Sequence, residues 1–311
     1  MNSGSTSLKL SAVDGEGTSS PVESFEGVPP GIAGVAHRIV HGGPRFREAV
    51  VIDAGVEREL SALSELVPLH DAPALAALAR ARRALPGVQH VAVFDTAFHA
   101  TIPDEASTYA VPSRWREEWD IRRYGFHGLS VAWAAEQVPV PRLVVCHLGG
   151  GCSVTAVRDG RSVDTTMGFT PLEGVPMATR AGSIDPAIVL HLIRTGKLEL
   201  PEVEIALERE SGLLGLSGVS GRVEELERSD DPAARLALSF FTYRVAGAVG
   251  AMAVALGGID ALVFTGGVGE HSARVRDEIC ARLAFLGALR VEVVDAREDV
   301  VAARAARELL A

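Results

Sequence analysis

Four polar side chains stand beside apolar or glycine-rich segments, where they could act on a charged substrate. Arg38 lies inside the segment HRIVHGG, and a cation within a strand is costly unless it meets an anion. Asp95 follows the apolar run VAVF, which puts a carboxylate at a strand end, a common place for sites in α/β sheets. His127 and Arg180 lie beside glycines in RRYGFHG and MATRAGS. These four are the candidate catalytic residues.

Each of the four residues also has a structural interpretation. Arg38 and Arg180 could be structural arginines in ion pairs, Asp95 could cap the next segment, and His127 could be a satisfied core histidine. The nine histidines show no metal-binding spacing, so a metal cluster is not expected. No GxSxG elbow occurs and no cysteine has a base partner nearby in sequence, which argues against nucleophilic hydrolases.

An internal repeat places glycine-rich turns in both halves of the chain. Residues 2–19 and 149–166 each pass from a Gly/Ser-rich turn into an alternating strand that ends in Asp-Gly, a strong hairpin signal. Backbone N–H groups in such turns can approach an anion because no Cβ blocks them. Together with FTGGVGE at residues 264–270, the repeat favours two hairpins that hold a polyphosphate, against the alternative of ordinary tight turns. No GxxxxGK[ST] or GxGxxG fingerprint supports a P-loop or dinucleotide-binding fold.

Apolar β-rich runs alternate with helical segments along the chain, which indicates an α/β protein. Strands are predicted at residues 35–40, 91–94, 143–147, 153–158 and 262–265, and helices at residues 56–65, 74–83, 184–195, 232–256 and 273–286. Residues 15–31, rich in Gly, Ser, Pro and Glu, are predicted to form a loop or linker. The apolar stretch 245–264 nearly reaches the length of a membrane span, but its Gly-Gly pair and Asp260 favour a buried helix, a turn and a buried strand.

Composition limits the partners and the compartment. A chain of 311 residues fits one large or two ordinary domains. The formal charge of -10 argues against nucleic acid or an anionic membrane as the main partner. Three cysteines without a CxxC spacing support neither a disulfide scaffold nor a zinc ribbon, so a reducing cytoplasm is expected. The first ten residues contain no basic leader and no apolar region, and no secretory signal is expected.

Motifs along the chain, taken together and in order, resemble those of one enzyme family. They read HRIVHGG, VPLH, VFDTAFHATIP, RRYGFHGLS, CHLGGGCSV, VDTTMGFTPLEG, MATRAGSIDPAI, SGLLGLSGVSG and LVFTGGVGEHSARVR. The chain is similar to acetate kinases and related short-chain acid kinases of the sugar-kinase/actin-like superfamily. The resemblance covers most of residues 35–286.

The resemblance implies an α/β fold with two lobes of the actin-like/sugar-kinase, ribonuclease H-like type. Duplicated mixed sheets flanked by helices would build the lobes, with the active site in the cleft between them. Residues 1–97 and 300–311 would form a shortened first lobe with the N-terminal phosphate hairpin. Residues 98–299 would form the second lobe, with the second phosphate hairpin and the nucleotide site. A homodimer is also expected from the family.

The implied reaction is reversible, Mg²⁺-dependent phosphoryl transfer from ATP to acetate, giving acetyl phosphate and ADP. A carboxylate is already ionised and needs no general base, so catalysis would consist of positioning and charge neutralisation. By the family pattern, Arg38 and Arg180 would hold the carboxylate and the moving phosphoryl group, which suits the bidentate geometry of arginine. His127 would stabilise the transition state, and Asp95 would orient the reacting groups or the metal.

The resemblance also implies binding residues. The acyl pocket maps to Val40, Leu69, Phe126 and Pro171, beside Arg38. The Mg²⁺-linked positions are Asn2, in the first hairpin turn, and Glu298. Nucleotide and phosphate contacts map to Ser5, Ser7, Lys9, His147, Gly149, Gly150, Gly151, Arg222, Gly266, Gly267, Gly269 and Glu270.

The chain departs from the family pattern at several places. Little sequence stands between Leu10 and Gly31, and the first hairpin turn follows Met1 directly, so either the true start lies upstream or the first lobe is trimmed. Gly150 replaces the usual Asn of the second turn, a change that butyrate kinases share. The acid-apolar-Arg triplet that holds the nucleoside becomes Arg222-Val223-Glu224, and the Asn after GlyGlu becomes His271.

These departures leave three alternatives open beside an acetate kinase that uses ATP. The acyl substrate could be propionate or butyrate, because one methylene changes binding by only about 1 to 3 kcal/mol. The donor could be another nucleotide or pyrophosphate. The chain could also be a trimmed homologue that binds nucleotide or acyl phosphate without turnover.

Overall fold

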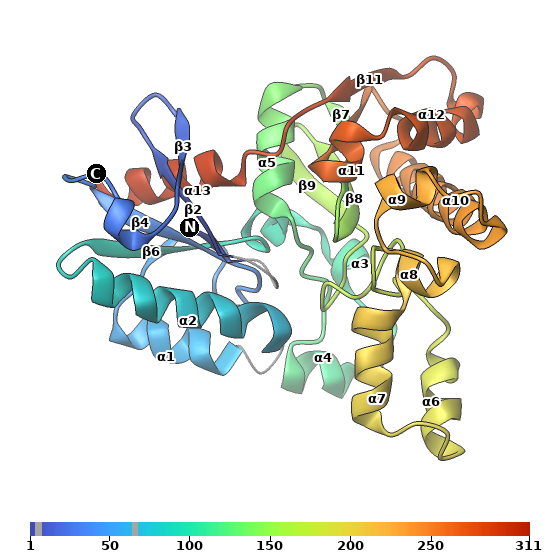
Figure 1. The fold of residues 1–311 in the computed structure, drawn as a ribbon, viewed down its shortest axis with the longest axis horizontal. Helices are drawn as coiled ribbons and strands as arrows, with labels where there is room; N and C mark the ends of the chain where they lie inside the picture. The colour runs from blue at the N-terminus through green and yellow to red at the C-terminus, as the bar shows by residue number, and fades with distance from the viewer. Residues whose placement is uncertain (4–7, 64–67) are drawn as a thin grey trace. The chain divides into compact units, whose positions relative to one another are not determined.

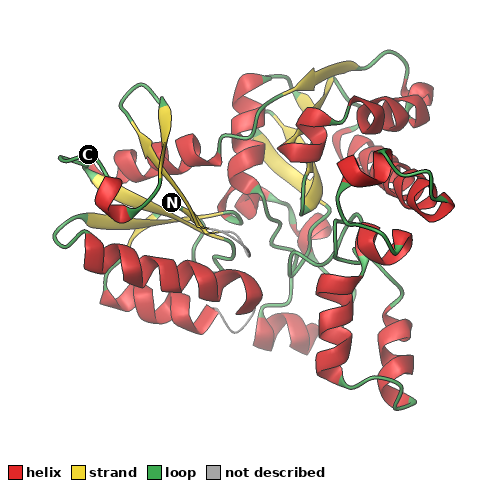
Figure 2. Ribbon diagram, viewed as in Figure 1, coloured by secondary structure: helices red, strands yellow, loops and turns green. Residues whose placement is uncertain are grey.

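The computed structural model describes residues 1–3, 8–63 and 68–311, with the side chains of residues 2, 3, 8 and 68–72 outside this description. The chain divides into two compact units, which are described separately (Figure 1). Unit 1 comprises Met1–Thr101, Phe126–Trp133 and Arg297–Ala311, and unit 2 comprises Ile102–Gly125 and Ala134–Ala296. Both units contain strands and helices (Figure 2), so the chain is an α/β protein.

Unit 1 contains a six-stranded mixed sheet in the order β3-β2-β1-β4-β6-β5. The strands are β1 (Asn2–Ser3), β2 (Leu8–Val13), β3 (Ser19–Val22), β4 (Gly34–Ile39), β5 (Val50–Val51) and β6 (Gln89–Phe94). β1, β4 and β6 are parallel to one another, whereas β2, β3 and β5 pair antiparallel with their neighbours. The carboxyl ends of β4 and β6 therefore lie side by side, which brings the residues after them together.

Helices cover both faces of the unit 1 sheet (Figure 1). On one face, α1 (Ala54–Leu63) and α2 (Pro68–Ala84) pack on Ile39, Ala92 and Phe94. On the other face, α13 (Glu298–Leu310) packs on Val91 and Val93. This alternation follows from the strand period of two, which sends successive side chains of β6 to opposite faces. β6 is consequently apolar from Val91 to Phe94, and all of it after Gln89 is buried.

Unit 2 contains a five-stranded sheet in the order β11-β10-β7-β8-β9. Its strands are β7 (Arg142–Leu148), β8 (Cys152–Arg158), β9 (Arg161–Thr165), β10 (Ala261–Thr265) and β11 (Arg290–Val293). β7, β8 and β9 form an antiparallel meander, and β10 and β11 add to β7 in parallel. β1, β2, β3, β4 and β6 of unit 1 have the same order and directions. The duplication predicted from the hairpin repeat is confirmed.

Unit 2 carries most of the helices, and α10 (Pro232–Leu256) is the longest. Asp231 caps its start through the Ala233 amide, Pro232 takes the first position, and Gly257 ends it in the left-handed conformation. The others are α3 (Asp104–Ser107), α4 (Ser113–Trp119), α6 (Pro186–Arg194), α7 (Leu200–Ile205), α8 (Gly212–Ser217), α9 (Val223–Glu227), α11 (Gly266–His271) and α12 (Ala273–Arg282). α5 (Gly128–Gln137) starts in unit 1 and ends in unit 2.

The apolar stretch at residues 245–264 forms the end of α10, a turn and the buried strand β10, as predicted. Among the described residues, α10 is the one helix long and apolar enough to span a membrane, and half of its most apolar stretch is buried within the protein.

Two local predictions were wrong. Residues 15–31 are not a plain loop, because they include β3 and a short 3₁₀ helix at Phe25–Gly27. Asn2 is not in the first hairpin turn but in β1, where its backbone pairs with Lys9 on one side and Arg38 on the other. Strand pairing therefore extends to the start of the described chain.

Candidate active site

The centre of the unit 1 site is an arginine held by two carboxylates. Arg38 lies near the end of β4 and donates from Nε and Nη2 to the two oxygens of Asp95, both at 2.7 Å. Its Nη1 donates to Oε2 of Glu298 at 3.0 Å. The Asp95 side chain is 1% exposed, and those of Arg38 and Glu298 are 15% and 16% exposed. The expectation that a cation in this strand must meet an anion is confirmed.

Sheet geometry explains how these three residues meet. Arg38 pairs in register with Val93 on β6, and the Asp95 amide donates to the Ile39 carbonyl at 3.0 Å, so Asp95 follows directly on the neighbouring strand. Glu298 is the first residue of α13, which packs on the same face of the sheet. Burial would lower the pKa of Arg38, but the charges of Asp95 and Glu298 outweigh it, so the pKa lies above its usual value. The cluster carries one net negative charge.

His127 lies beside this cluster, on the segment that enters α5. The Gly128 amide donates to the backbone carbonyl of Asp95 at 3.0 Å. Nε2 of His99 bonds the carbonyl of Phe126 at 2.8 Å, and the His99 side chain is buried. His127, between these two anchors, has a left-handed backbone with φ of 58° and a half-buried side chain. The loop after β6 therefore contacts both neighbours of His127.

Three apolar members of the predicted acyl pocket, Val40, Leu69 and Phe126, lie in unit 1. Phe126 is 1% exposed, and its ring meets the His41 ring edge-on, with centroids 5.4 Å apart. His41 accepts a hydrogen bond at Nδ1 from the Gly43 amide at 2.8 Å. Val40, half-buried, connects His41 to β4. The backbone of Leu69 lies in α2, and its side chain is outside the description.

Two glycine-rich turns lie side by side in unit 2: residues 149–151, called the first turn, and the start of α11 at residues 266–270, called the second turn. β7 and β10 are parallel neighbours, with His147 opposite Thr265, so the segments that follow them adjoin. Gly149 closes the first turn by donating to the Gly151 carbonyl at 3.0 Å. Gly150 and Gly267 are exposed, and the position of a Cβ on either is empty. Their backbones can therefore be approached by an anion.

Glu270 closes the second turn from inside. Its Oε1 accepts hydrogen bonds from the amides of Gly266 and Ala296, each at 2.9 Å. Gly266 has a φ of 77°, and a Cβ there would stand 3.2 Å from Nε2 of His147. The buried hydroxyl of Thr265, directly before this turn, has no hydrogen-bond partner. Glu270 thus shapes the turn through its carboxylate.

Arg180 is carried on a loop that touches the first of these turns. The Ala178 amide donates to the Gly150 carbonyl at 3.3 Å. Nη1 of Arg180 donates to the carbonyl of Pro171 at 3.0 Å. Burial lowers the pKa of Arg180, partly offset by Glu208, and the guanidinium stays charged because its ordinary pKa is far above neutrality. Arg180, Pro171 and the first turn therefore belong to one local site in unit 2.

The motif SGLLGLSG, at residues 211–218, holds the Arg180 loop through backbone hydrogen bonds. The Leu213 amide donates to the Met177 carbonyl at 2.9 Å, and the Ser211 amide donates to the Thr179 carbonyl at 3.0 Å. A Cβ on Gly212 would overlap the carbonyl oxygen of Met177. A glycine is therefore required for this close approach.

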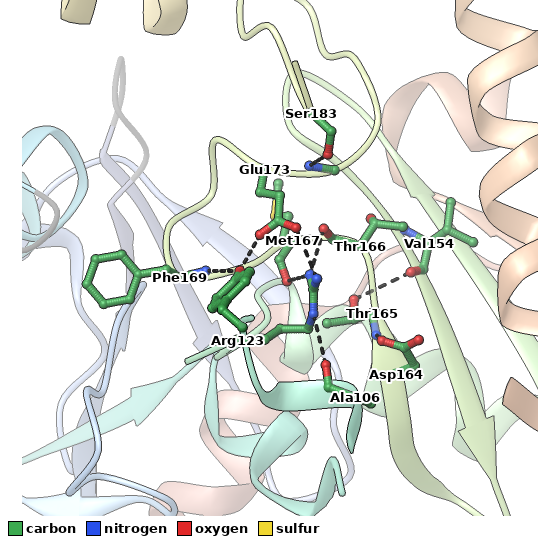
Figure 3. A network of polar contacts seen from close by, with 12 residues as sticks. Ala106, Arg123, Val154, Asp164, Thr165, Thr166, Met167, Phe169, Glu173 and Ser183 are labelled. Atoms are coloured by element: carbon green, nitrogen blue, oxygen red, sulfur yellow. Dashed lines mark hydrogen bonds and ion pairs between the residues drawn. The ribbon is translucent and has the colours of Figure 1, made fainter. Parts of the chain in front are cut away.

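A polar network clamps the segment that leads from β9 to Arg180 (Figure 3). Arg123 donates to the carbonyls of Thr166 and Met167 at 3.0 Å and to Oε1 of Glu173 at 3.0 Å. Tyr109 donates to Glu173 and accepts from the Phe169 amide at 2.9 Å. Burial raises the pKa of Tyr109, which keeps the phenol protonated as a donor. This network fixes the backbone before Pro171, at Thr166, Met167 and Phe169, and holds the Glu173 side chain after it.

The predicted site residues thus fall into two local groups. The unit 1 group contains Arg38, Asp95, His127, Val40, Phe126 and Glu298, with the backbone of Asn2 beside Arg38. The unit 2 group contains Arg180, Pro171, His147, Gly149, Gly150, Gly151, Gly266, Gly267, Gly269 and Glu270. Ser5 and Ser7 lie outside the described residues, and Lys9 is exposed on β2.

Arg222 differs from the other predicted residues. It precedes α9 with a side chain 70% exposed, and it pairs with Glu224 and Glu225 of its own helix.

Sequence reasoning missed the residues that support the site. His41 and His99 occur in the quoted motifs but carry no local signal of their contacts, which join segments up to 85 residues apart. Arg123 and Glu173 stand in two different motifs, and only the fold brings them into one ion pair.

Comparison with known proteins supplies the family. The model of the acetokinase family matches residues 23–308. The acetate kinase of Nostoc punctiforme is 46% identical over 264 residues, covering 81% of this chain and 65% of the relative. The acetate kinase of Deinococcus radiodurans is 48% identical over 272 residues, covering 84% and 68%. The chain therefore spans about two thirds of the length of these relatives.

Solved structures agree with this assignment. A propionate kinase from Francisella tularensis superposes with a TM-score of 0.85 at 35% identity, covering 88% of this chain and 78% of that chain. Porphyromonas gingivalis acetate kinase gives a TM-score of 0.82 at 30% identity, covering 97% and 90%. The fold is the duplicated α/β architecture of these kinases, as the motifs predicted. On its family model, its relatives and its fold, the chain belongs to the acetokinase family.

Proposed function

We propose that the chain catalyses reversible phosphoryl transfer from ATP to acetate, giving acetyl phosphate and ADP. The observation that carries the proposal is the Arg38 guanidinium held between Asp95 and Glu298, with His127 anchored to the same loop. A cation fixed by one buried and one half-buried carboxylate keeps its orientation before substrate arrives, which is the preorganisation that charge stabilisation requires. The family membership of the chain supports the same reaction.

In this reaction a carboxylate oxygen of acetate attacks the γ-phosphorus, and the bond to the bridging oxygen of ADP breaks. No proton has to be removed from the attacking group. Arg38 and Arg180 would neutralise charge on the carboxylate and on the phosphoryl oxygens, and His127 would donate a hydrogen bond to the transferring group. The protein's contribution is to hold these groups in line and to exclude water.

The unit 1 cluster fits a magnesium ion. Mg²⁺ is usually bound by one or two carboxylates together with substrate phosphates, and Asp95 and Glu298 supply two carboxylates around one guanidinium. No group of three or more His, Cys, Asp or Glu side chains that could hold a metal ion occurs among the described residues. When bound, the ion would neutralise phosphate charge. Asp95 and Glu298 would hold it.

The nucleotide phosphates would meet the two glycine turns of unit 2. Gly150 and Gly267 leave their backbones open, and Arg180 is carried on a loop joined to the first turn. Arg222 and Glu224 stand where the family holds the nucleoside, and in this chain they pair with each other. ATP is the proposed donor, and GTP and pyrophosphate are the comparisons that test it.

A homodimer is part of the proposal, and the face of α10 supports it. Leu236, Tyr243 and Val254 are 62%, 61% and 84% exposed on one helix. With Phe240 and the small residue Gly247, they repeat at intervals of three, four and seven, which makes a continuous apolar stripe. A second copy of α10 could cross this stripe closely at its glycine about a two-fold axis.

Sedimentation velocity tests the dimer. Wild type is expected to sediment as a dimer at micromolar concentration, and V254E as a monomer. The matched control V219E, at an exposed site off this helix, is expected to stay dimeric. A wild-type monomer would reject the dimer. A cytoplasmic location is also proposed, since the three cysteines are free thiols that suit a reducing compartment.

Acyl hydroxamate formation tests the reaction. The purified protein is incubated with Mg²⁺, hydroxylamine, one of acetate, propionate or butyrate, and one of ATP, GTP or pyrophosphate, beside an Arg180→Ala control. Product with acetate and ATP that disappears in the control is expected. A preference for propionate or butyrate would revise the acyl chain length. No product with any pair from a folded protein would favour a homologue that binds without turnover.

A further inference from the structure

His127 is held in an unusual backbone conformation between two fixed neighbours. Its φ of 58° lies in the left-handed region, which strains the backbone of a residue that has a Cβ. Such a conformation persists only when surrounding contacts determine it. Two such contacts lie on either side of His127: the Phe126 carbonyl accepts a hydrogen bond from His99, and the Gly128 amide donates to the Asp95 carbonyl.

Gly128 is packed against the loop after β6. A Cβ at this position would overlap the carbonyl oxygen of Asp95 and stand 2.9 Å from Cβ of Phe98. Only glycine allows the segment to approach so closely. One side of His127 is therefore fixed to the same residue whose carboxylate orients Arg38.

His99 fixes the other side. A carbonyl oxygen can only accept, so Nε2 of His99 must carry the proton in its 2.8 Å bond to Phe126. The side chain is 2% exposed, and burial lowers the pKa of His99 to about 4, so the ring is neutral at physiological pH. The donor is available across the whole physiological range.

We propose that His99 is a positioning residue that determines where the His127 imidazole lies. The loop at residues 95–99 would then position both Arg38 and His127. The proposal rests on the function proposed above. His99 acts through its hydrogen bond to the Phe126 carbonyl. Loss of the His99 N–H donor would break one of the two contacts that hold the strained backbone of His127, and the His127 imidazole would move.

The test uses three substitutions at His99. His99→Gln keeps an N–H donor at a similar reach, His99→Asn keeps the amide but shortens it by one methylene, and His99→Leu removes the donor. The kcat of His99→Asn and His99→Leu is expected to fall by about 10- to 100-fold, with KM for both substrates nearly unchanged. His99→Gln is expected to retain kcat within about threefold of wild type. His90→Leu removes another buried histidine of unit 1, whose ring bonds His37, and it should keep kcat.

A double-mutant cycle separates positioning from general damage. If His99 acts through His127, His99→Asn combined with His127→Ala should have the kcat of His127→Ala alone. If the fold-losses in kcat of the two single variants multiply in the double variant, the proposal is overturned. Full activity of a folded His99→Asn would overturn it too. Should His99→Leu fail to fold, His99→Asn and His99→Gln still decide the result.

A second measurement does not depend on turnover. In NMR spectra of protein with isotope-labelled histidine, the ring signal of His127 is assigned by its loss in His127→Ala. The chemical shift of this signal is expected to change in His99→Asn and to stay the same in His99→Gln. An unmoved signal in His99→Asn would reject positioning. If wild type shows no phosphoryl transfer, the proposed function fails, and this measurement still decides whether His99 positions His127.

Discussion

Asp95→Asn is the substitution that most directly probes the charge cluster. Asp95 binds Arg38 through two 2.7 Å contacts and is 1% exposed. The asparagine has the same shape but no charge, and its nitrogen faces a guanidinium that can only donate. Arg38 would keep its hydrogen bond to Glu298.

The expected loss of stability follows from the geometry. Two unit charges about 4 Å apart interact by about 4 kcal/mol at an effective dielectric constant near 20. Breaking a buried pair by removing one partner costs about 3 to 5 kcal/mol. Because Glu298 still neutralises Arg38 and the guanidinium is 15% exposed, the lower end applies. Asp95→Asn should therefore lower the free energy of unfolding by about 3 kcal/mol.

Urea unfolding and steady-state kinetics measure the two consequences. Asp260→Asn is the matched control, because Asp260 also holds an arginine, Arg142, by its Nε at 3.1 Å but at a much more exposed position of unit 2. The control should lose less stability and keep kcat, whereas Asp95→Asn should lose at least about 10²-fold in kcat. Equal stability losses in the two variants, or normal kcat in Asp95→Asn, would refute the reasoning.

Three further outcomes are expected. Arg180→Ala should lower kcat on the order of 10³-fold or more, and Arg180→Lys should restore little of it because lysine lacks the planar fork; recovery in the lysine variant, measured by initial rates, would count against bidentate contact. His127→Gly should be more stable than His127→Ala by about 1 kcal/mol in urea unfolding, because glycine accepts the φ of 58° without strain; the reverse order would contradict the conformation. The pKa of His99 is lowered from 6.5 to about 4, so the unfolded chain binds a proton first as the pH falls. The resulting stability is fully present above pH 6.5 and is lost toward pH 4, by roughly 3 kcal/mol. Between these pH values, the free energy of unfolding measured in urea should change less steeply with pH for His99→Gln than for wild type. An identical pH dependence in the two proteins would be evidence against the buried neutral ring.

The central strands and the long helix could be predicted because their signals are local. β6, β7 and β10 each contain a continuous apolar run of four residues, and α10 begins at Asp-Pro and ends at Gly. β3 could not, because Ser19–Val22 contains Pro21 and few strand-forming residues. A proline is tolerated there because β3 is the outermost strand of its sheet.

The candidate site was predictable in part. Arg38 within a strand pointed to an anionic partner, and Asp95 at the end of the next parallel strand was a candidate for it. The bond to Glu298, 260 residues away, depends on where α13 packs, which no local pattern states. The role of His99 is still less visible in sequence, since it depends on a backbone carbonyl that a left-handed turn places beside its ring.

The most direct test of the central claim is the reverse reaction. Purified protein is mixed with acetyl phosphate and MgADP, and ATP is measured by luciferase, with Arg180→Ala treated identically. The account predicts rapid ATP formation by wild type that falls on the order of 10³-fold or more in the variant. A folded wild-type protein that binds ADP yet forms no ATP would contradict it.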